Sequence, residues 1–479
     1  MIRRWSMISA VLAFGLLVAP ISCKTTEGQS TDDPLTGADK KVPRFFDEIP
    51  ADSFYVFTGL EPLPREVTEA ILARADDPIT DGYIEMLEKS TKTGGKLADL
   101  TLAAARVFDG KINPEGLEEL GFDLNPHYAL YGVGGMPVIQ LELGDAATFE
   151  ATLERIVDQA GLEVATKKKK GVEYRIYEEG ATKVVVTVRD GYLVAAASDA
   201  AATSTILAYV LGHETPNKSL ADRRRIESIA GKYDYEKFGA GYVDVRGLVE
   251  TFSGIAEPGP TTKAVLEAIE TEIPEQSEAC RKEIGSLADA TPRAVFGVRE
   301  LTARSMRVHG GLEITTGVGG ELTETVEPVP GLESKLFQRA ALAIGFGVNL
   351  KSLVETTRRH AEAIVEKPYQ CEDLEPMNRW AKRAARRPVP PVLEGLRGGA
   401  LIVESINFDK GGFIPRNVEA MALARMENPQ ALIGRMKPVV PGMMKTEIAD
   451  DGVPVPLRQL GKMVAFLKVP HVALKGDAL

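Results

Sequence analysis

The chain has 479 residues, of which 44% are hydrophobic and 26% charged, the composition of a globular protein with two or three domains. Its formal net charge of −11 excludes a nucleic-acid partner, because phosphate binding needs a basic surface. The same charge disfavours broad adhesion to anionic lipid.

The first 22 residues have the pattern of a secretory signal. Two arginines open it, and the uncharged apolar run over residues 7–18 is too short to span a bilayer comfortably. The segment that ends at Cys23 resembles a bacterial lipoprotein signal, in which the cysteine is lipidated and becomes the mature N-terminus, although Pro20 stands where such signals usually have Leu. We expect a signal peptide over residues 1–22 and a lipid on Cys23. The alternative is plain secretion with a chance cysteine.

A polar, small-residue segment follows the cysteine. Residues 23–44 are rich in Thr, Ser, Asp, Gly and Lys, a composition that predicts a flexible tether between membrane and fold. Lys24, rather than Asp, follows the cysteine and favours the outer membrane if the cell has one.

The folded part begins with a strand and then alternates helices and hairpins. Phe54 to Thr58 is a β-type run behind a Pro-Ala-Asp turn, and helical periodicity follows in residues 65–74, 82–89 and Lys96 to Phe108. The runs HYALYGV, from His127, and PVIQLEL, from Pro137, predict two strands joined by a turn. The hairpin-rich pattern predicts antiparallel strands with a helix crossing one face of each sheet.

Two internal repeats support this reading. The strand and helix around residues 137–156 recur near residues 419–439, where apolar helix positions keep one constant offset: Phe149 with Leu432, Leu153 with Met436, and Ile156 with Val439. A second echo matches YVDVRGLVET with GVNLKSLVET and places Asp244 opposite Asn349. We expect an α+β fold of duplicated units. The expected domains are residues 45–235 and residues 236–479, the second with an internal repeat of the first.

Lys167, Lys168, Lys169 and Lys170 form the densest run of charge. The run lies between a predicted strand and GVEYRIY, so we expect an exposed hairpin loop that is a candidate partner-contacting site. Its simpler interpretation is a solvated surface without a partner.

The cysteine count predicts one disulfide. If Cys23 carries the lipid, Cys280 and Cys371 remain as an even pair in an exported chain, where oxidation is permitted. The alternative is two free buried thiols. Neither cysteine lies in a C-x-x-C motif or near a histidine at ligand spacing, so we expect no metal site.

Several stretches resemble an uncharacterised family of bacterial envelope lipoproteins with duplicated α+β units. They are the opening IPADSFYVF, the strand and helix PVIQLELGDAATFEATLERIV, and VRDGYLVAAASDAA followed by SLAD at Ser219 to Asp222. The likeness covers most of residues 46–479 and rests on diffuse motifs. It implies export and duplication, and no activity or ligand.

Known catalytic motifs are missing from the sequence. The five histidines, His127, His213, His309, His360 and His471, are scattered without metal-ligand spacing. There is no G-x-S-x-G and no S-x-x-K, and the glycine-rich spots near residues 132, 317 and 345 complete no phosphate loop. We expect tight hairpin turns at two of these spots.

We therefore expect a lipid-anchored cell-envelope protein, in the outer membrane, that acts as a non-catalytic binding or structural module without a cofactor. Its partners would be the membrane, through the lipid on Cys23, and a protein or small apolar ligand in a crevice between the two halves. The alternative is an exported hydrolase or other enzyme whose site is built from a carboxylate pair.

Overall fold

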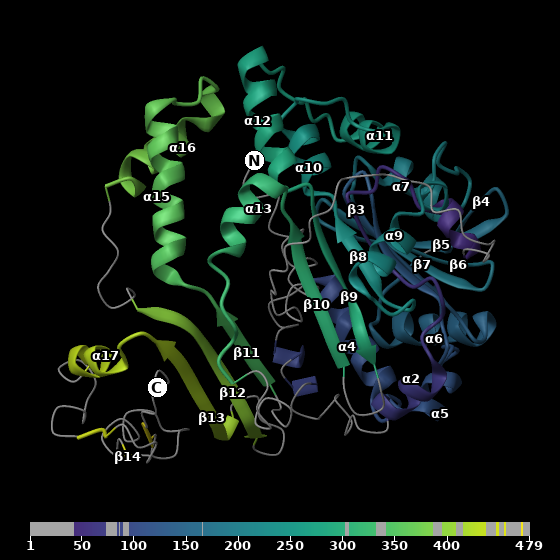
Figure 1. Ribbon diagram of the computed structural model, residues 1–479. Helices are drawn as coiled ribbons and strands as arrows, with labels where there is room; N and C mark the ends of the chain where they lie inside the picture. Colours follow the sequence, from purple (N-terminus) through teal and green to yellow (C-terminus); the bar gives the residue numbers. More distant parts are fainter. Residues whose placement is uncertain are drawn as a thin grey trace. The chain divides into compact units, whose positions relative to one another are not determined.

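A computed structural model of the chain describes residues 43–72, 84–85, 87–89, 95–164, 166–301, 306–331, 342–386, 395–408, 415–436, 447–449, 455–456 and 471–472. Helices and antiparallel strands alternate along these residues (Figure 1). The predicted α+β class is therefore confirmed. Within the described residues no helix combines the length and apolarity needed to cross a bilayer.

Two compact units divide the described chain, one ending at Ile314 and the other beginning at Thr315. The sequence predicted a boundary after residue 235 instead. The difference has a physical cause: β8 (Ala240–Val243) pairs with β1 (Tyr55–Thr58), so the strands after residue 235 complete the first sheet.

The first unit contains one ten-stranded antiparallel sheet. Its strand order is β10-β9-β8-β1-β2-β3-β7-β6-β5-β4, so β10 and β4 are its edges. The further strands are β2 (Tyr128–Val133), β3 (Met136–Glu142), β4 (Thr166–Lys169), β5 (Val172–Glu179), β6 (Thr182–Arg189), β7 (Tyr192–Asp199), β9 (Arg293–Leu301) and β10 (Met306–Glu313).

Alternating side chains explain why one face of this sheet is the core. Val185, Val194 and Tyr242 are fully buried, and their strand neighbours point to the opposite face. The hairpins that join these strands are tight: Asp190–Gly191 links β6 to β7 with positive φ at both residues, the geometry of a two-residue turn that matches strand twist.

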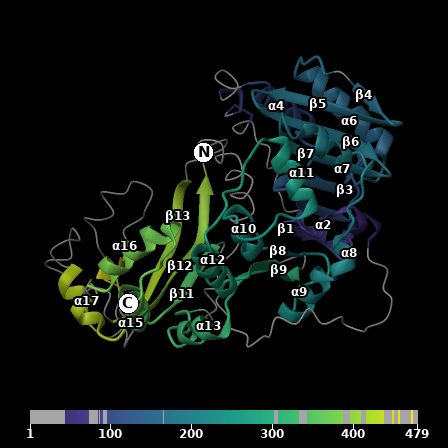
Figure 2. The ribbon, with the colours of Figure 1, turned by 90° about the horizontal axis from the view of Figure 1, so that it is seen from above.

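The helices of the first unit pack on both faces of the sheet. Helices α7 and α9 contact β7 and β8, and α4 and α6 contact β5 and β6 (Figures 1 and 2). The helical elements are η2 (Arg44–Glu48), α2 (Arg65–Leu72), α4 (Lys96–Phe108), α5 (Pro114–Glu119), α6 (Ala146–Gln159), α7 (Thr203–Val210), α8 (Leu220–Arg223), α9 (Arg225–Tyr233), α10 (Val245–Phe252), α11 (Pro260–Ala268) and α12 (Glu278–Ala290).

The second unit has a three-stranded antiparallel sheet, β11-β12-β13, and a two-stranded one, β14-β15. Ile402 is fully buried on one face of the larger sheet, whereas Ile344 and Phe346 are about half exposed on the other. The elements are α13 (Thr316–Thr323), β11 (Leu342–Gly347), α15 (Leu350–Glu366), η3 (Glu372–Leu374), α16 (Glu375–Ala384), β12 (Leu396–Phe408), β13 (Pro415–Met426), α17 (Pro429–Met436), β14 (Val455–Pro456) and β15 (His471–Val472).

Both sequence repeats fall on one recurring order of elements: a strand, helices, a hairpin and a helix. The order occurs three times, beginning at β1, at β8 and at β11. In each case the first strand pairs with the first strand of the hairpin, as β1 with β2, β8 with β9 and β11 with β12. The described elements therefore contain three copies of this unit, where the sequence predicted a duplication.

The repeated units also match at the N-terminal caps of α10 and α15. Asp244 caps α10 by accepting from the backbone N of Gly247 at 2.8 Å. Asn349 caps α15 by accepting from the N of Ser352 at 3.1 Å. The same strand, cap and helix thus arise from residues that align in the sequence, because a side-chain oxygen there satisfies a free N–H of the first turn.

The glycine-rich spots prove to be three different structures. Gly134 and Gly135 form the predicted turn between β2 and β3. The spot near residue 345 lies within β11, and the one near residue 317 lies within α13. The expectation of a second hairpin turn was therefore wrong. Glycine disfavours the interior of a helix or strand, but the pairing of β11 with β12 and the formation of α13 override this local preference.

Candidate functional site

Cys23, the predicted lipidation site, lies outside the described residues, as do the predicted signal peptide and all of the predicted tether but its last two residues. The described part of the chain begins at residue 43. We name residues 43–52 the N-terminal junction, since they connect the predicted tether to the sheet.

Three apolar side chains of the N-terminal junction belong to the core of the first unit. Phe45, Phe46 and Ile49 are at most 2% exposed. Phe45 contacts the ring of Phe46 edge to face at 5.1 Å. These side chains explain why so short a segment is fixed, because each buried large apolar side chain contributes about 1.5–3 kcal/mol.

A buried ion pair fastens the same segment to β6. Arg189 at the end of β6 is 7% exposed, and its Nη2 lies 2.6 Å from the Oε2 of Glu48. Its Nη1 also donates to Glu48 Oε1, at 3.2 Å, and its Nε donates to the carbonyl of Val210 at 2.8 Å. Burial alone lowers the pKa of Arg189, but Glu48 outweighs it and leaves this pKa above its ordinary value.

The Pro-Ala-Asp turn makes two further attachments. Pro50 forms an antiparallel bridge with Ser219, so the IPADSFYVF and SLAD stretches of the sequence meet in space. Asp52 Oδ2 accepts from the backbone N of Thr261 and of Thr262, at 3.1 and 3.3 Å, at the start of α11. The N-terminal junction is therefore held by β6, by the segment before α8 and by α11.

The lysine run is a strand rather than the loop that the sequence predicted. Lys167, Lys168 and Lys169 lie in β4, whose four residues are all exposed, and Lys170 is the first residue of a two-residue turn. The strand pairs because its neighbour β5 offers a long partner and Gly171 accommodates positive φ in the turn. Lys168 is paired with Glu173 of β5 at 3.1 Å.

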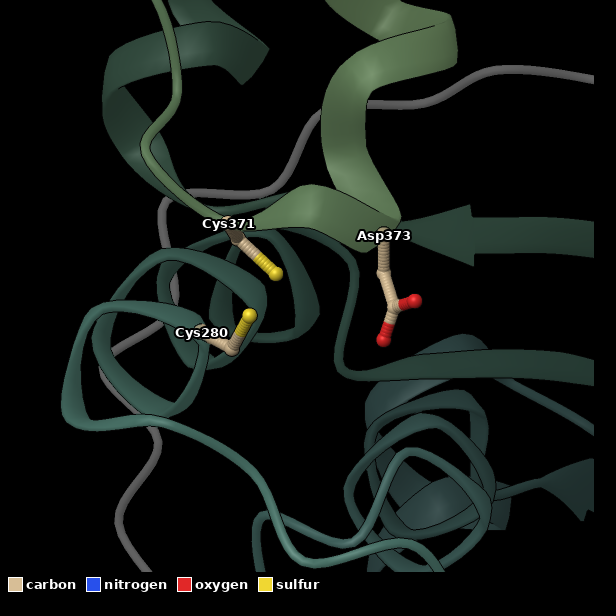
Figure 3. A group of neighbouring side chains, drawn as sticks. All are labelled: Cys280, Cys371 and Asp373. Carbon is tan, nitrogen blue, oxygen red and sulfur yellow. The ribbon is translucent and has the colours of Figure 1, made fainter.

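Cys280 and Cys371 lie together, as the predicted disulfide requires. Cys280 in α12 and Cys371 at the start of η3 are 5% and 2% exposed and are disulfide-bonded (Figure 3). The structure therefore has the pair that the sequence selects. The carboxylate of Asp373 completes a group whose potential ligand atoms all lie within 4.8 Å of one another. Metals bind thiolates, so the oxidised sulfurs leave Asp373 as the one ordinary ligand of this group.

A second charged cluster, which sequence reasoning missed, closes the end of β10. Glu313 accepts from Tyr233 Oη at 2.6 Å, from Lys232 Nζ at 3.0 Å and from Arg293 Nε at 2.8 Å. Burial raises the pKa of Glu313, but Tyr233 and the two cations outweigh it and hold this pKa below its ordinary value of 4.5. Glu313 reads as one acidic residue among many, and only folding brings its partners together.

Three of the five histidines contact an ionisable side chain elsewhere in the chain. His309 in β10 is 6% exposed, and its Nδ1 lies 2.6 Å from the Oη of Tyr235, whose pKa burial raises to about 12. His127 contacts Glu142 at 2.7 Å, and His360 contacts Glu321 at 2.9 Å on an exposed part of α15. His213 lies after α7, and His471 in β15.

Carboxylates with a displaced pKa share one direction. Among the described residues, each Asp or Glu with a resolved shift has its pKa lowered: Glu85, Glu119, Asp145, Asp222 and Glu313. Lysine, backbone N–H or hydroxyl partners account for the lowering, mostly in capping and surface pairs. A general acid at neutral pH needs the opposite displacement.

Comparisons of the chain with protein-family models, with curated proteins and with solved structures found no match.

Proposed function

We propose that this chain is a lipid-anchored cell-envelope protein, attached through Cys23, whose folded part is a non-catalytic binding or structural module. The signal-like start of the sequence motivates the anchor. The attachment of the N-terminal junction is the structural observation that carries the proposal.

A protein anchored by its N-terminus transmits every pull on its tether to the first folded residues. Here Phe45 and Phe46 bury their side chains in the core. Glu48 forms an ion pair with Arg189, and Asp52 accepts a hydrogen bond from the start of α11. Terminal segments of domains usually fray unless they are tied down in this way. Such a junction suits a chain that is held at one end.

The described ionisable groups support binding rather than catalysis. Glu48 and Glu313 are each engaged by an arginine, as expected for carboxylates with a structural role. The alternative of a carboxylate-based hydrolase would be favoured instead by hydrolytic activity that a single Asp or Glu substitution removes while the protein stays folded.

The intact mass of the protein purified from its own membranes tests the anchor. We expect a chain that begins at Cys23, carries the mass of acyl chains and partitions into detergent. Cys23→Ala should abolish the added mass and the partitioning.

Cys280→Ala is the matched control, because it removes another cysteine and should leave acylation unchanged. An unacylated, freely soluble wild-type chain would overturn the anchor. A lipid that survives Cys23→Ala would place the attachment elsewhere.

A further inference from the structure

Strand β4 combines an open sheet edge with an excess of positive charge. It is the last strand of the ten-stranded sheet, and in the part of the chain that the structure describes it pairs with β5 alone. In an antiparallel pair, every second residue points its N–H and C=O away from the partner. The outer side of β4 therefore presents backbone groups that another strand could use.

The lysines of β4 alternate between the two faces of the sheet. Lys168 lies opposite Glu173 in the strand register and forms an ion pair with it. Lys167 and Lys169 share the other face, where they lie opposite Tyr174 and Val172. One face of the edge is thus charge-compensated by β5, and the other carries two lysines opposite uncharged residues.

The lysines of this hairpin act electrostatically on His213. Burial and then the charges of Lys170 and Lys169 lower the pKa of His213, which follows α7. The four consecutive lysines thus concentrate positive charge at the hairpin, although the chain as a whole carries a net charge of −11.

These features select the chemistry of a partner. A second copy of β4 in antiparallel pairing would place lysine near lysine, which is repulsive. A bilayer of anionic lipid would offer nothing to the open backbone groups and would be repelled by the net negative chain. An extended segment with acidic residues at alternate positions would satisfy both the backbone groups and Lys167 and Lys169.

We propose that β4 is a docking edge for an acidic, extended peptide segment of a partner protein, which adds to the sheet as an eleventh strand. This goes beyond membrane anchoring, and it holds whether or not Cys23 is acylated. Main-chain bonds would supply much of the affinity, and the lysines would select the acidic sequence and its register.

The test uses the full chain carrying Cys23→Ala and three fluorescent eight-residue peptides. One alternates glutamate and threonine, the second alternates lysine and threonine, and the third alternates glutamate and proline. We expect the Glu-Thr peptide to bind, with fluorescence anisotropy reporting affinity, and binding to weaken as salt is raised. The Glu-Pro peptide keeps the charge but lacks half of the N–H donors, so it should bind far more weakly.

Charge reversal provides the matched variants. Lys167→Glu/Lys169→Glu should weaken Glu-Thr binding by about tenfold or more and make the Lys-Thr peptide the better ligand. Lys263→Glu/Lys282→Glu changes the total charge equally on exposed positions of α11 and α12 and should leave binding unchanged.

Three results would overturn the proposal. Equal binding of the Glu-Pro peptide would exclude strand addition. An equal loss in both double variants would reduce the effect to net charge. Binding to phosphatidylglycerol vesicles that depends on Lys167 and Lys169, without peptide binding, would assign the edge to the membrane instead.

Discussion

Two cation–carboxylate pairs of the ten-stranded sheet, Arg189 with Glu48 and Lys168 with Glu173, differ in their surroundings. Arg189 of β6 is 7% exposed and holds Glu48 through two of its nitrogens, whereas Lys168 of β4 and Glu173 of β5 are each more than 60% exposed. Water screens the second pair strongly and the first much less, since the side chain of Glu48 is 25% exposed. The same chemistry therefore holds the chain in place at the first pair and contributes little stability at the second.

The largest effect should come from breaking the buried pair. Arg189→Ala leaves Glu48 without its cation, and removing one partner of a buried pair costs about 3–5 kcal/mol of unfolding free energy. Urea unfolding followed by circular dichroism measures the change. Glu48→Leu/Arg189→Met removes both charges and should recover most of the loss. If the double variant is no better than Arg189→Ala, the pair itself is not what stabilises the junction.

The stabilisation from the disulfide can be compared with that from the Arg189–Glu48 pair. A disulfide acts mainly by restricting the unfolded chain. Cys280→Ala should lower the free energy of unfolding by about 2–4 kcal/mol, in line with the long loop that the Cys280–Cys371 bond closes. A reducing agent should lower the wild-type value to that of the variant. A wild-type chain whose urea midpoint ignores the reductant would contradict the bond's contribution.

The stabilisation that Glu313 contributes should depend on pH. Its pKa is lowered in the folded chain, so its contribution is complete above the unfolded value, near 4.5, and disappears as the pH falls through the folded value. Glu313→Gln should therefore destabilise the protein at neutral pH by about 1–3 kcal/mol and flatten its stability profile below about pH 4.5. Glu154→Gln is the control: it removes a carboxylate whose side chain is 67% exposed and should change the free energy of unfolding at neutral pH by less than about 0.5 kcal/mol.

The cap on α11 should have a smaller effect. Asp52→Ala leaves the N–H groups of Thr261 and Thr262 without their acceptor and should cost about 1 kcal/mol. Amide hydrogen exchange of the first turn of α11 would report the loss directly. Exchange that stays as slow as in the wild type would mean that another group replaces the carboxylate.

The exposed Lys168–Glu173 pair should contribute almost nothing to the free energy of unfolding. Lys168→Ala should change the free energy of unfolding by less than about 0.5 kcal/mol, because solvent already screens the pair and the side chain of Glu173 regains its freedom. A loss comparable with that of Arg189→Ala would show that burial is not what separates the two pairs.

Local signals in the sequence predicted the elements well where pattern and packing agree. The helix expected over Lys96 to Phe108 is α4, and the strand expected at Phe54 to Thr58 is β1. The periodicity of apolar residues records which face is buried, so it survives folding unchanged. The lysine run was harder, since a fully exposed edge strand has no apolar face to reveal it.

The charged clusters could not have been predicted. Glu48 and Arg189 lie 141 residues apart, and each looks like an ordinary surface residue beside a turn. The domain boundary failed for the same reason, because nothing local in residues 240–243 says that β8 will pair with β1. Long-range pairing is set by the whole fold, which a single sequence does not display.

The place of β1 has a consequence for how the chain acquires its structure. This strand lies between β2 and β8, and Tyr55 pairs with Val243, so one of its edges stays open until much of the chain is present. Pairings between such distant residues slow folding and lengthen the time for which a strand edge is exposed. A nascent chain would therefore need protection from aggregation at β1 until β8 is available to pair with it.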